Sequence, residues 1–236
     1  MLARGWHATV ALLAIGAIVL QVAIAIRLSG TPHDVSTGLL RGSSLAGRII
    51  RVFSFFTISS TLLSGIVSAQ LAVRPDRDGT AWRTLRLAAL AGITVSGACY
   101  ASLLPAIHEP DGTAEITANT IVHYVVPIMT VAGWLLFGPR PRVGLRRVWW
   151  SLLFPVLWLA CTLVRGAIWN WYPYPFFDVT ANGYLSVAVN AVLLTVLLEV
   201  VAAAFAMADV LLPAAPRPPA KLTKARSRRP RRVIRP

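Results

Sequence analysis

Charged residues are scarce in this sequence. They make up 14% of its 236 residues, against about 25% in a typical soluble domain, while 56% of the residues are hydrophobic. The mean hydropathy is +0.65. This composition excludes an ordinary soluble globular protein, and it also excludes disorder over most of the chain.

Cysteines and short catalytic motifs are scarce as well. The two cysteines, Cys99 and Cys161, lie inside apolar runs, so neither a disulfide framework nor a cysteine metal cluster can be read from them. The sequence contains no Gly-x-Ser-x-Gly, His-Glu-x-x-His, Gly-rich phosphate loop or Cys-x-x-Cys. We therefore expect no metal and no cofactor, and no motif of this kind assigns an enzyme class.

Long apolar runs are what the chain has in place of charge. A helix needs about 20 apolar residues to cross the hydrocarbon core, and such runs occupy roughly residues 6–26, 49–73, 85–107, 119–137, 148–169 and 182–212. They predict an all-α polytopic membrane protein, with a six-transmembrane-helix bundle over residues 1–212. Ala23 and Ala25 would permit signal-peptide cleavage, but the first run exceeds the usual length of about 7–15 residues, which favours an uncleaved anchor.

Basic residues mark one side of this bundle. Arginines gather between the second and third runs, between the fourth and fifth, and in the C-terminal tail, whereas residues 104–118 and 169–181 contain no Lys or Arg. The positive-inside rule then predicts that both termini are cytoplasmic, in a multi-pass protein of the cell membrane. The first connection disagrees, because it should face outward yet carries Arg27, Arg41, Arg48 and Arg51; the other regions outweigh it.

The C-terminal segment 213–236 forms a separate region. It holds six prolines, nine basic residues and no acidic residue, which predicts a disordered cytoplasmic tail. The positive charge is consistent with a positive-inside anchor. It also favours binding to anionic lipid headgroups, which contributes up to about 1 kcal/mol of binding free energy per basic residue. Membrane lipids are therefore the expected partners. Nucleic acid is not, because the tail lacks aromatic residues that could stack on bases.

Polar residues inside the apolar runs are candidates for a functional site, because they are costly in a membrane. In the second run they repeat every three or four residues, as one face of a helix does: Ser54, Thr57, Thr61, Ser64 and Ser68. Such small hydroxyl residues also line close helix–helix contacts in membranes. Both interpretations of this hydroxyl stripe remain open.

The later runs carry polar faces of their own. The fourth run repeats Asn119, His123, Pro127, Thr130 and Trp134 at helical spacing, and His123 is the one histidine in the middle of an apolar run. Helix packing and proton transfer are both open for it. The fifth run contributes Arg165, for which snorkelling to the interface is the alternative. The sixth contributes Asn182 and Asn190, while Glu199 lies on another face, toward the cytoplasmic half.

Several of these polar residues are expected at similar depths, in the outer half of the membrane. With a rise of 1.5 Å per residue, Thr57 lies roughly 12 Å below the outer surface, and His123 and Arg165 lie roughly 6 Å below it. A hydroxyl, a histidine and hydrogen-bond donors suffice for acyl transfer, since the histidine can take the hydroxyl proton and the donors can stabilise an oxyanion. We therefore take Thr57 and His123 as catalytic candidates. The substrate-binding candidates are Arg165, Asn119, Asn182, Asn190 and Trp134.

Four separated motifs carry a family resemblance. They are Arg51-Val-Phe-Ser-Phe-Phe-Thr57-Ile-Ser-Ser60, His123-Tyr-Val-Val-Pro127 with the following Trp134, Tyr172-Pro-Tyr-Pro-Phe-Phe-Asp178, and Asn182-Gly-Tyr184. Together they resemble the "Pr-six-Pr" family of uncharacterised actinobacterial six-helix membrane proteins. The layout is more distantly similar to the androgen-induced membrane proteins, six-helix hydrolases of branched fatty-acid esters with a catalytic threonine in helix 2 and histidine in helix 4. That resemblance implies Thr57 as the nucleophile and His123 as its base.

Three classes of function follow from these patterns. The first is an intramembrane threonine hydrolase of lipid or fatty-acid esters that enter laterally from the outer leaflet. The second is a small-molecule or proton transporter in which Glu199 and His123 titrate, although no two-fold repeat is evident. The third is a non-enzymatic structural protein whose polar faces serve helix packing. The sequence leaves the substrate and the oligomeric state open.

Overall fold

The protein is a bundle of helices. The computed structural model describes residues 1–27, 43–103, 110, 112–140 and 143–213. Within these residues there is no strand, and six helical segments are long and apolar enough to cross a membrane: Leu2–Arg27, Phe56–Val73, Thr80–Ser102, Gly112–Phe137, Leu145–Trp169 and Val179–Leu211. The expected all-α six-helix membrane bundle is therefore confirmed. The predicted tail lies outside the described residues, apart from its first residue, Pro213.

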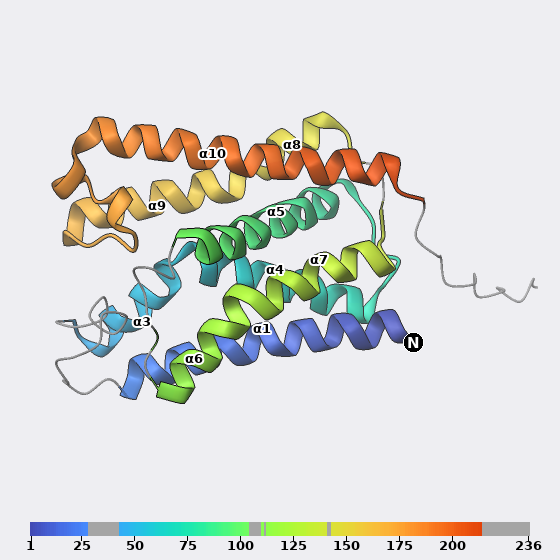
Figure 1. Cartoon of the computed structure of the whole chain (residues 1–236), viewed down its shortest axis with the longest axis horizontal. Coiled ribbons are helices and arrows are strands. Elements are labelled where there is room, and N and C mark those ends of the chain that lie inside the picture. Colours follow the sequence, from blue (N-terminus) through green and yellow to red (C-terminus); the bar gives the residue numbers. More distant parts are fainter. Residues whose placement is uncertain (28–42, 104–109, 111, 141–142, 214–236) are drawn as a thin grey trace, which may run out of the picture.

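The chain divides these segments into shorter elements. In order they are α1 (Leu2–Arg27), α3 (Leu45–Ser54), α4 (Phe56–Val73), α5 (Thr80–Leu103), α6 (Gly112–Thr120), the π-helix η1 (Ile121–Val125), α7 (Val126–Phe137), α8 (Leu145–Ser151), α9 (Leu153–Trp169), the 3₁₀-helix η2 (Pro175–Phe177) and α10 (Val179–Leu211). The start of α1 and the end of α10 lie at the same end of the bundle, which we call the terminal end (Figure 1). The opposite end, with α3 and the α9–α10 connection, is the lid end.

The second apolar run is two helices rather than the single one expected. Phe55 is extended, with φ −71° and ψ 133°, and it separates α3 from α4. Ser54 therefore belongs to α3, where its hydroxyl donates to the Ile50 carbonyl at 2.5 Å, and it does not continue the hydroxyl stripe of α4. The periodicity of small hydroxyl residues hid this break, because a single extended residue changes the spacing very little.

Other boundaries differ from expectation in smaller ways. The fifth run is divided at Leu152 into α8 and α9, and the fourth begins seven residues earlier than expected, at Gly112. The sixth begins at Val179, where Asp178 caps α10 through the Thr180 and Ala181 N–H groups. The earlier starts of the fourth and sixth segments place more helix at the lid end than the apolar pattern alone predicts.

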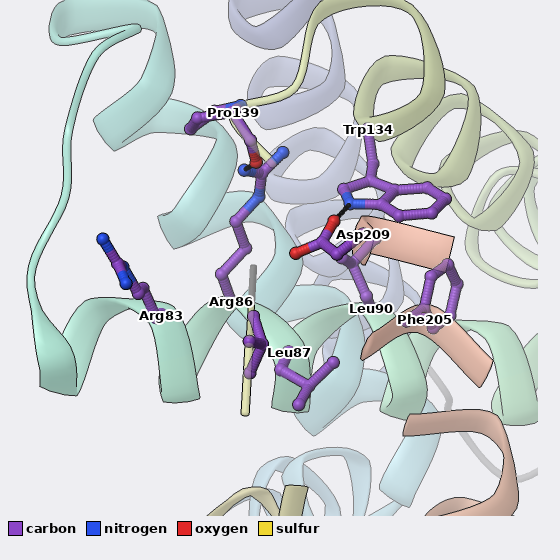
Figure 2. A pocket seen from close by; sticks show the side chains of 9 residues that line it. Arg83, Arg86, Leu87, Leu90, Trp134, Pro139, Phe205 and Asp209 are labelled. Carbon is purple, nitrogen blue, oxygen red and sulfur yellow. Dashed lines mark hydrogen bonds between the residues drawn. The ribbon is translucent and has the colours of Figure 1, made fainter. Parts of the chain in front are cut away.

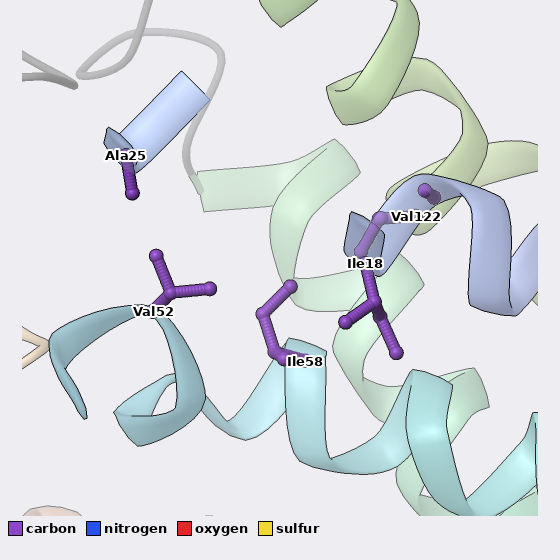
Figure 3. Packing of buried hydrophobic residues seen from close by; sticks show 6 residues of the cluster. Ile18, Ala25, Val52, Ile58 and Val122 are labelled. Atoms are coloured by element: carbon purple, nitrogen blue, oxygen red, sulfur yellow. The ribbon is translucent and has the colours of Figure 1, made fainter. Parts of the chain in front are cut away.

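Helix α4 packs closely against α1. A Cβ on Gly65 of α4 would lie 3.0 Å from the Ala14 Cβ of α1, so the two helices approach closely. Toward the lid end, α1 meets α3, α4 and η1 in an apolar cluster; Figure 3 shows its members Ile18, Ala25, Val52, Ile58 and Val122. Small side chains allow such contact between membrane helices.

Candidate functional site

A cavity of about 390 Å³ lies in the lid half of the bundle. Its walls come from α4, α5, η1, α9, η2 and α10, and they include Thr57, His123 and Asn190 of the candidates derived from the sequence. The remaining walls are mostly apolar, with Phe56, Val95, Trp158, Leu193, Leu194 and Leu197 among them. The structure thus brings the proposed nucleophile and base to one apolar chamber.

Thr57 lies in the first turn of α4 because Phe55 interrupts the helix just before it. The exposed fraction of Thr57 is 9%, and its hydroxyl accepts a hydrogen bond from the Ser96 hydroxyl of α5 at 2.8 Å. The Phe56 N–H, left without an intrahelical acceptor at a helix start, donates to the Tyr174 hydroxyl at 3.1 Å. Helices α4 and α5 and the α9–α10 connection therefore position this threonine.

The remaining hydroxyls of the stripe serve packing. Ser60, Thr61, Ser64 and Ser68 are all buried, and none of them lines the cavity. Ser64 donates to the Ala89 carbonyl of α5 at 3.5 Å, and a Cβ on Gly92 would lie 3.0 Å from the Ser60 oxygen. The two interpretations of the stripe therefore apply to different parts of α4. The hydroxyls toward the terminal end serve packing, and Thr57 at the other end lines the cavity.

A local change of helix type positions His123. The Val126 N–H donates to the Ile121 carbonyl, an i to i−5 bond that makes residues 121–125 one π-helical turn. Pro127 has no N–H for the His123 carbonyl, and α5 approaches this point so closely that a Cβ on Gly97 would lie 2.9 Å from that oxygen. Such π-turns occur frequently at functional sites.

The His123 ring is oriented by its neighbours. Its Nδ1 lies 3.1 Å from the Asn119 carbonyl oxygen, so Nδ1–H donates and Nε2 carries the basic lone pair. The ring stacks on Tyr100, with centroids 3.7 Å apart and planes at 20°. The Asn119 side chain donates to the Tyr100 hydroxyl at 2.6 Å. Asn119 therefore supports the histidine and its stacking partner but does not itself line the cavity.

An aromatic segment closes the lid end of the cavity. We call residues 171–178 the lid; its Tyr174, Phe176 and Phe177 line the chamber. Asn190 donates to the Phe176 carbonyl at 2.9 Å, and Asn182 donates to the Pro175 carbonyl at 2.7 Å. The structure thus shows these two amides bonded to the lid backbone. Of the two, only Asn190 also lines the cavity, and a substrate-binding role for Asn182 stays a prediction.

Two further candidates lie away from the chamber. Arg165 approaches the Thr162 hydroxyl at 3.4 Å and does not line the cavity. Trp134 lies toward the terminal end, where its indole N–H donates to Asp209 at 3.1 Å (Figure 2). Arg165 and Trp134 therefore do not line this chamber, and their substrate-binding role stays a prediction. Helical spacing indicated which face each residue occupies but not which residues lie opposite that face.

The terminal end holds a separate polar cluster. Arg86 is buried and donates to the carbonyls of Gly138 and Pro139, which form the turn after α7. In Figure 2 its guanidinium points toward Pro139, and the hydrogen-bonded Trp134 and Asp209 lie to one side of it. This arrangement ties α5, the α7 turn and α10 together, so its role is structural.

Three chamber residues were missed at the sequence level: Ser96, Tyr100 and Tyr174. Ser96 and Tyr100 are four residues apart in α5, the spacing of one helix face, and this signal was available. Tyr174 was noted only as part of an aromatic lid. Burial raises the pKa of Tyr174, so its hydroxyl remains protonated and able to donate at neutral pH.

Comparison with known proteins adds no assignment. No family model, curated protein or solved structure matches the chain. The resemblance to the "Pr-six-Pr" family therefore stays a prediction. Among the described residues no group of three or more His, Cys, Asp or Glu is placed to hold a metal ion.

Proposed function

We propose that this integral membrane protein is a hydrolase of lipid or fatty-acid esters, with Thr57 as the nucleophile and His123 as the general base. The observation that carries the proposal is the presence of both side chains in the wall of one apolar cavity. They come from separate helices, α4 and η1, and each is held by defined hydrogen bonds. Covalent acyl transfer needs a nucleophile within reach of a base that a further group orients, and the shared cavity and the Asn119 bond to His123 support such an arrangement.

The chemistry needs no group beyond these residues, the ester and water. The Thr57 proton passes to His123 Nε2 as the Thr57 oxygen bonds to the carbonyl carbon and the carbonyl π electrons move onto oxygen. The tetrahedral intermediate then expels the alcohol, which takes the proton from the imidazolium. Water, activated by the same imidazole, hydrolyses the acyl-threonine and restores the free hydroxyl. The Nδ1 bond to the Asn119 carbonyl fixes the tautomer that this sequence requires.

The cavity walls support a lipid substrate. Its volume of about 390 Å³ lies in the range of ligand pockets, about 300–1,000 Å³. Leu193 and Leu197 of α10 line the cavity while 62% and 41% of their surfaces stay exposed on the apolar outside of the bundle. A chain dissolved in the bilayer can therefore reach Thr57 sideways, past α10, without passing through water.

The test is ester hydrolysis by purified protein in detergent, using 4-nitrophenyl esters of increasing acyl length. Thr57→Ala and His123→Ala should each reduce kcat/KM by at least about 100-fold, and the double variant should be no worse than either single variant. Thr57→Ser should retain activity because the hydroxyl survives. Thr61→Ala is the matched control, since Thr61 is buried one turn further along α4 and lies outside the cavity.

A covalent probe separates chemistry from binding. A fluorophosphonate should label the wild-type protein at Thr57 and fail to label Thr57→Ala. Full ester turnover in folded Thr57→Ala would contradict the assignment of the nucleophile. Saturable binding of the ester without turnover by the wild type would make the cavity a lipid-binding site instead. The transporter alternative gains no support here, because Glu199 does not line the cavity that holds His123.

A further inference from the structure

The walls of the chamber carry no charged side chain apart from His123 when it is protonated. No Lys, Arg, Asp or Glu is among the described residues that line the cavity. Arg165 and Asp178 belong to the same half of the bundle, but Arg165 approaches the Thr162 hydroxyl and Asp178 caps the start of α10. An ionised group on a ligand would therefore find no fixed charge of opposite sign in this chamber.

The polar groups that do line the chamber are uncharged hydrogen-bonding groups. Thr57 of α4 and Ser96 and Tyr100 of α5 contribute hydroxyls. Helix α10 contributes an apolar stretch made of Leu193, Leu194 and Leu197. Hydroxyls can bond to the oxygens of an ester or an alcohol, whereas the leucines can contact only a hydrocarbon chain. This division matches an uncharged amphiphile.

The chamber is reached from the hydrocarbon region. Tyr174, Phe176 and Phe177 close its lid end, while 62% of the surface of Leu193 is exposed on the apolar outside of the bundle. A lipid must therefore leave the membrane–water interface to bring its ester bond to Thr57. Moving an ionised headgroup out of water without a partner is strongly unfavourable.

We infer that the chamber selects neutral lipid esters, in which no ionised group lies near the ester bond, and rejects phosphate-bearing and other anionic lipids. This inference names the substrate class of the proposed hydrolase and rests on that function. The proposed chemistry has the same requirement, because an anion beside His123 favours the imidazolium form. That form lacks the lone pair that accepts the Thr57 proton. Uncharged walls thus keep the base in its reactive form.

The chain supplies its own reporter of an occupied chamber. Cys99 is a free thiol that lines the cavity, so a bound ligand should slow its alkylation by an apolar maleimide. In a Cys161→Ala background, the neutral ether 1-O-dodecylglycerol is compared with dodecyl phosphate, which has the same chain and resists hydrolysis by an esterase as well. The neutral probe should protect Cys99 at a mole fraction in the micelle at least about tenfold lower than the anionic probe.

Cys161 provides the matched control. It is exposed on α9 and does not line the cavity, so in a Cys99→Ala background neither probe should change its alkylation rate. Placing a cation in the wall should reverse the preference: Leu194→Arg supplies a partner for phosphate, and dodecyl phosphate should then protect Cys99 at the lower mole fraction. Leu194→Met leaves the wall uncharged and should keep the wild-type order. Should Leu194→Arg fail to fold, the comparison in the wild-type wall decides alone.

The outcomes separate this inference from the function on which it rests. Equal or stronger protection by dodecyl phosphate in the wild-type wall, or no protection by either probe, would overturn the inference. So would an unchanged order of the two probes in folded Leu194→Arg. Turnover of anionic esters that requires Thr57 and His123 and equals that of neutral esters would overturn the inference and leave the hydrolase standing. Preferential protection by the neutral probe without any ester turnover would support the neutral lipid chamber and overturn the hydrolase.

Discussion

Adding a single methyl group at Gly166 should displace the lid. Gly166 is buried in α9, and a Cβ built on it would lie 2.0 Å from the Tyr172 ring, with two further ring atoms within 2.5 Å. Ordinary contact between carbon atoms begins near 3.5 Å, so the ring must retreat by about 1.5 Å. Tyr172 is two residues from Tyr174, and the displacement therefore reaches the chamber.

The net effect of Gly166→Ala on stability combines two opposing terms. Alanine favours the helix over glycine by about 1 kcal/mol, whereas overpacking a filled site costs about 1–3 kcal/mol. We expect a net loss of up to about 2 kcal/mol, which lowers Tm by several degrees at about 2–4 °C per kcal/mol for a chain of this length. Ester hydrolysis should fall as well, because the Tyr174 hydroxyl leaves its place beside Thr57.

Thermal unfolding in detergent measures this prediction, with Gly16→Ala as the matched control. Gly16 lies in α1, and a Cβ there would meet nothing within 4 Å, so alanine should leave Tm unchanged or raise it. Tyr172→Leu should partly relieve the clash, giving a favourable coupling of about 0.5–3 kcal/mol in the double variant. A Tm for Gly166→Ala at or above that of the wild type would refute the close packing of the lid on α9.

Four further predictions concern the rest of the molecule. Arg86→Met should lower the free energy of unfolding by several kcal/mol, since each buried carbonyl left unpaired costs about 1–3 kcal/mol; Arg86→Lys should lose less, and a wild-type Tm in Arg86→Met would contradict this. Hydrogen bonds from Arg83 lower the pKa of Asp78 to about 2 from 3.8, so the small stabilisation from this exposed pair is present above pH 3.8 and lost as the pH falls toward 2; the Tm difference between wild type and Asp78→Asn should vanish over that window. Removing residues 214–236 should leave Tm unchanged, because Pro213, whose carbonyl accepts from Arg140, is retained. It should weaken binding to anionic vesicles in a salt-sensitive manner, and equal binding by both forms would exclude the tail as the lipid contact. Asp178→Cys should be labelled by an impermeant thiol reagent from outside the cell, whereas labelling only after lysis would reverse the predicted orientation.

The sequence was sufficient for the membrane spans because the apolar runs are long and separated by arginine-rich or proline-rich segments. It was insufficient where one residue changes the backbone. The extended Phe55 and the π-turn at Ile121–Val125 leave the 3.6-residue pattern almost intact. These two irregularities nevertheless place Thr57 at a helix start and orient His123, so the site depends on features with very weak sequence signals.

The first connection shows how a charge rule can mislead about an individual residue. Arg51 was counted against the predicted orientation, since it lies in a segment that should face outward. In the structure its guanidinium stacks over the Trp171 ring of the lid, 5.0 Å from the ring centroid. Phe55 meets the same ring edge-on, at 6.1 Å. An arginine held by an aromatic partner has a local structural role. It therefore says less about the orientation of the protein in the membrane than an arginine in an open loop does.

The α4 stripe carries the most general consequence. Thr57, Ser60, Thr61, Ser64 and Ser68 share a residue class, a helix and burial, yet only Thr57 lines the cavity. The difference arises from what faces each residue. Ser60 and Ser64 pack against α5. Thr57 instead accepts from Ser96 and borders the cavity, beside the Phe56 N–H that donates to Tyr174. A hydroxyl becomes a candidate nucleophile through donors and space supplied by other segments. Sequence periodicity reports only on a residue's own helix, so it can identify the stripe but cannot select the reactive member.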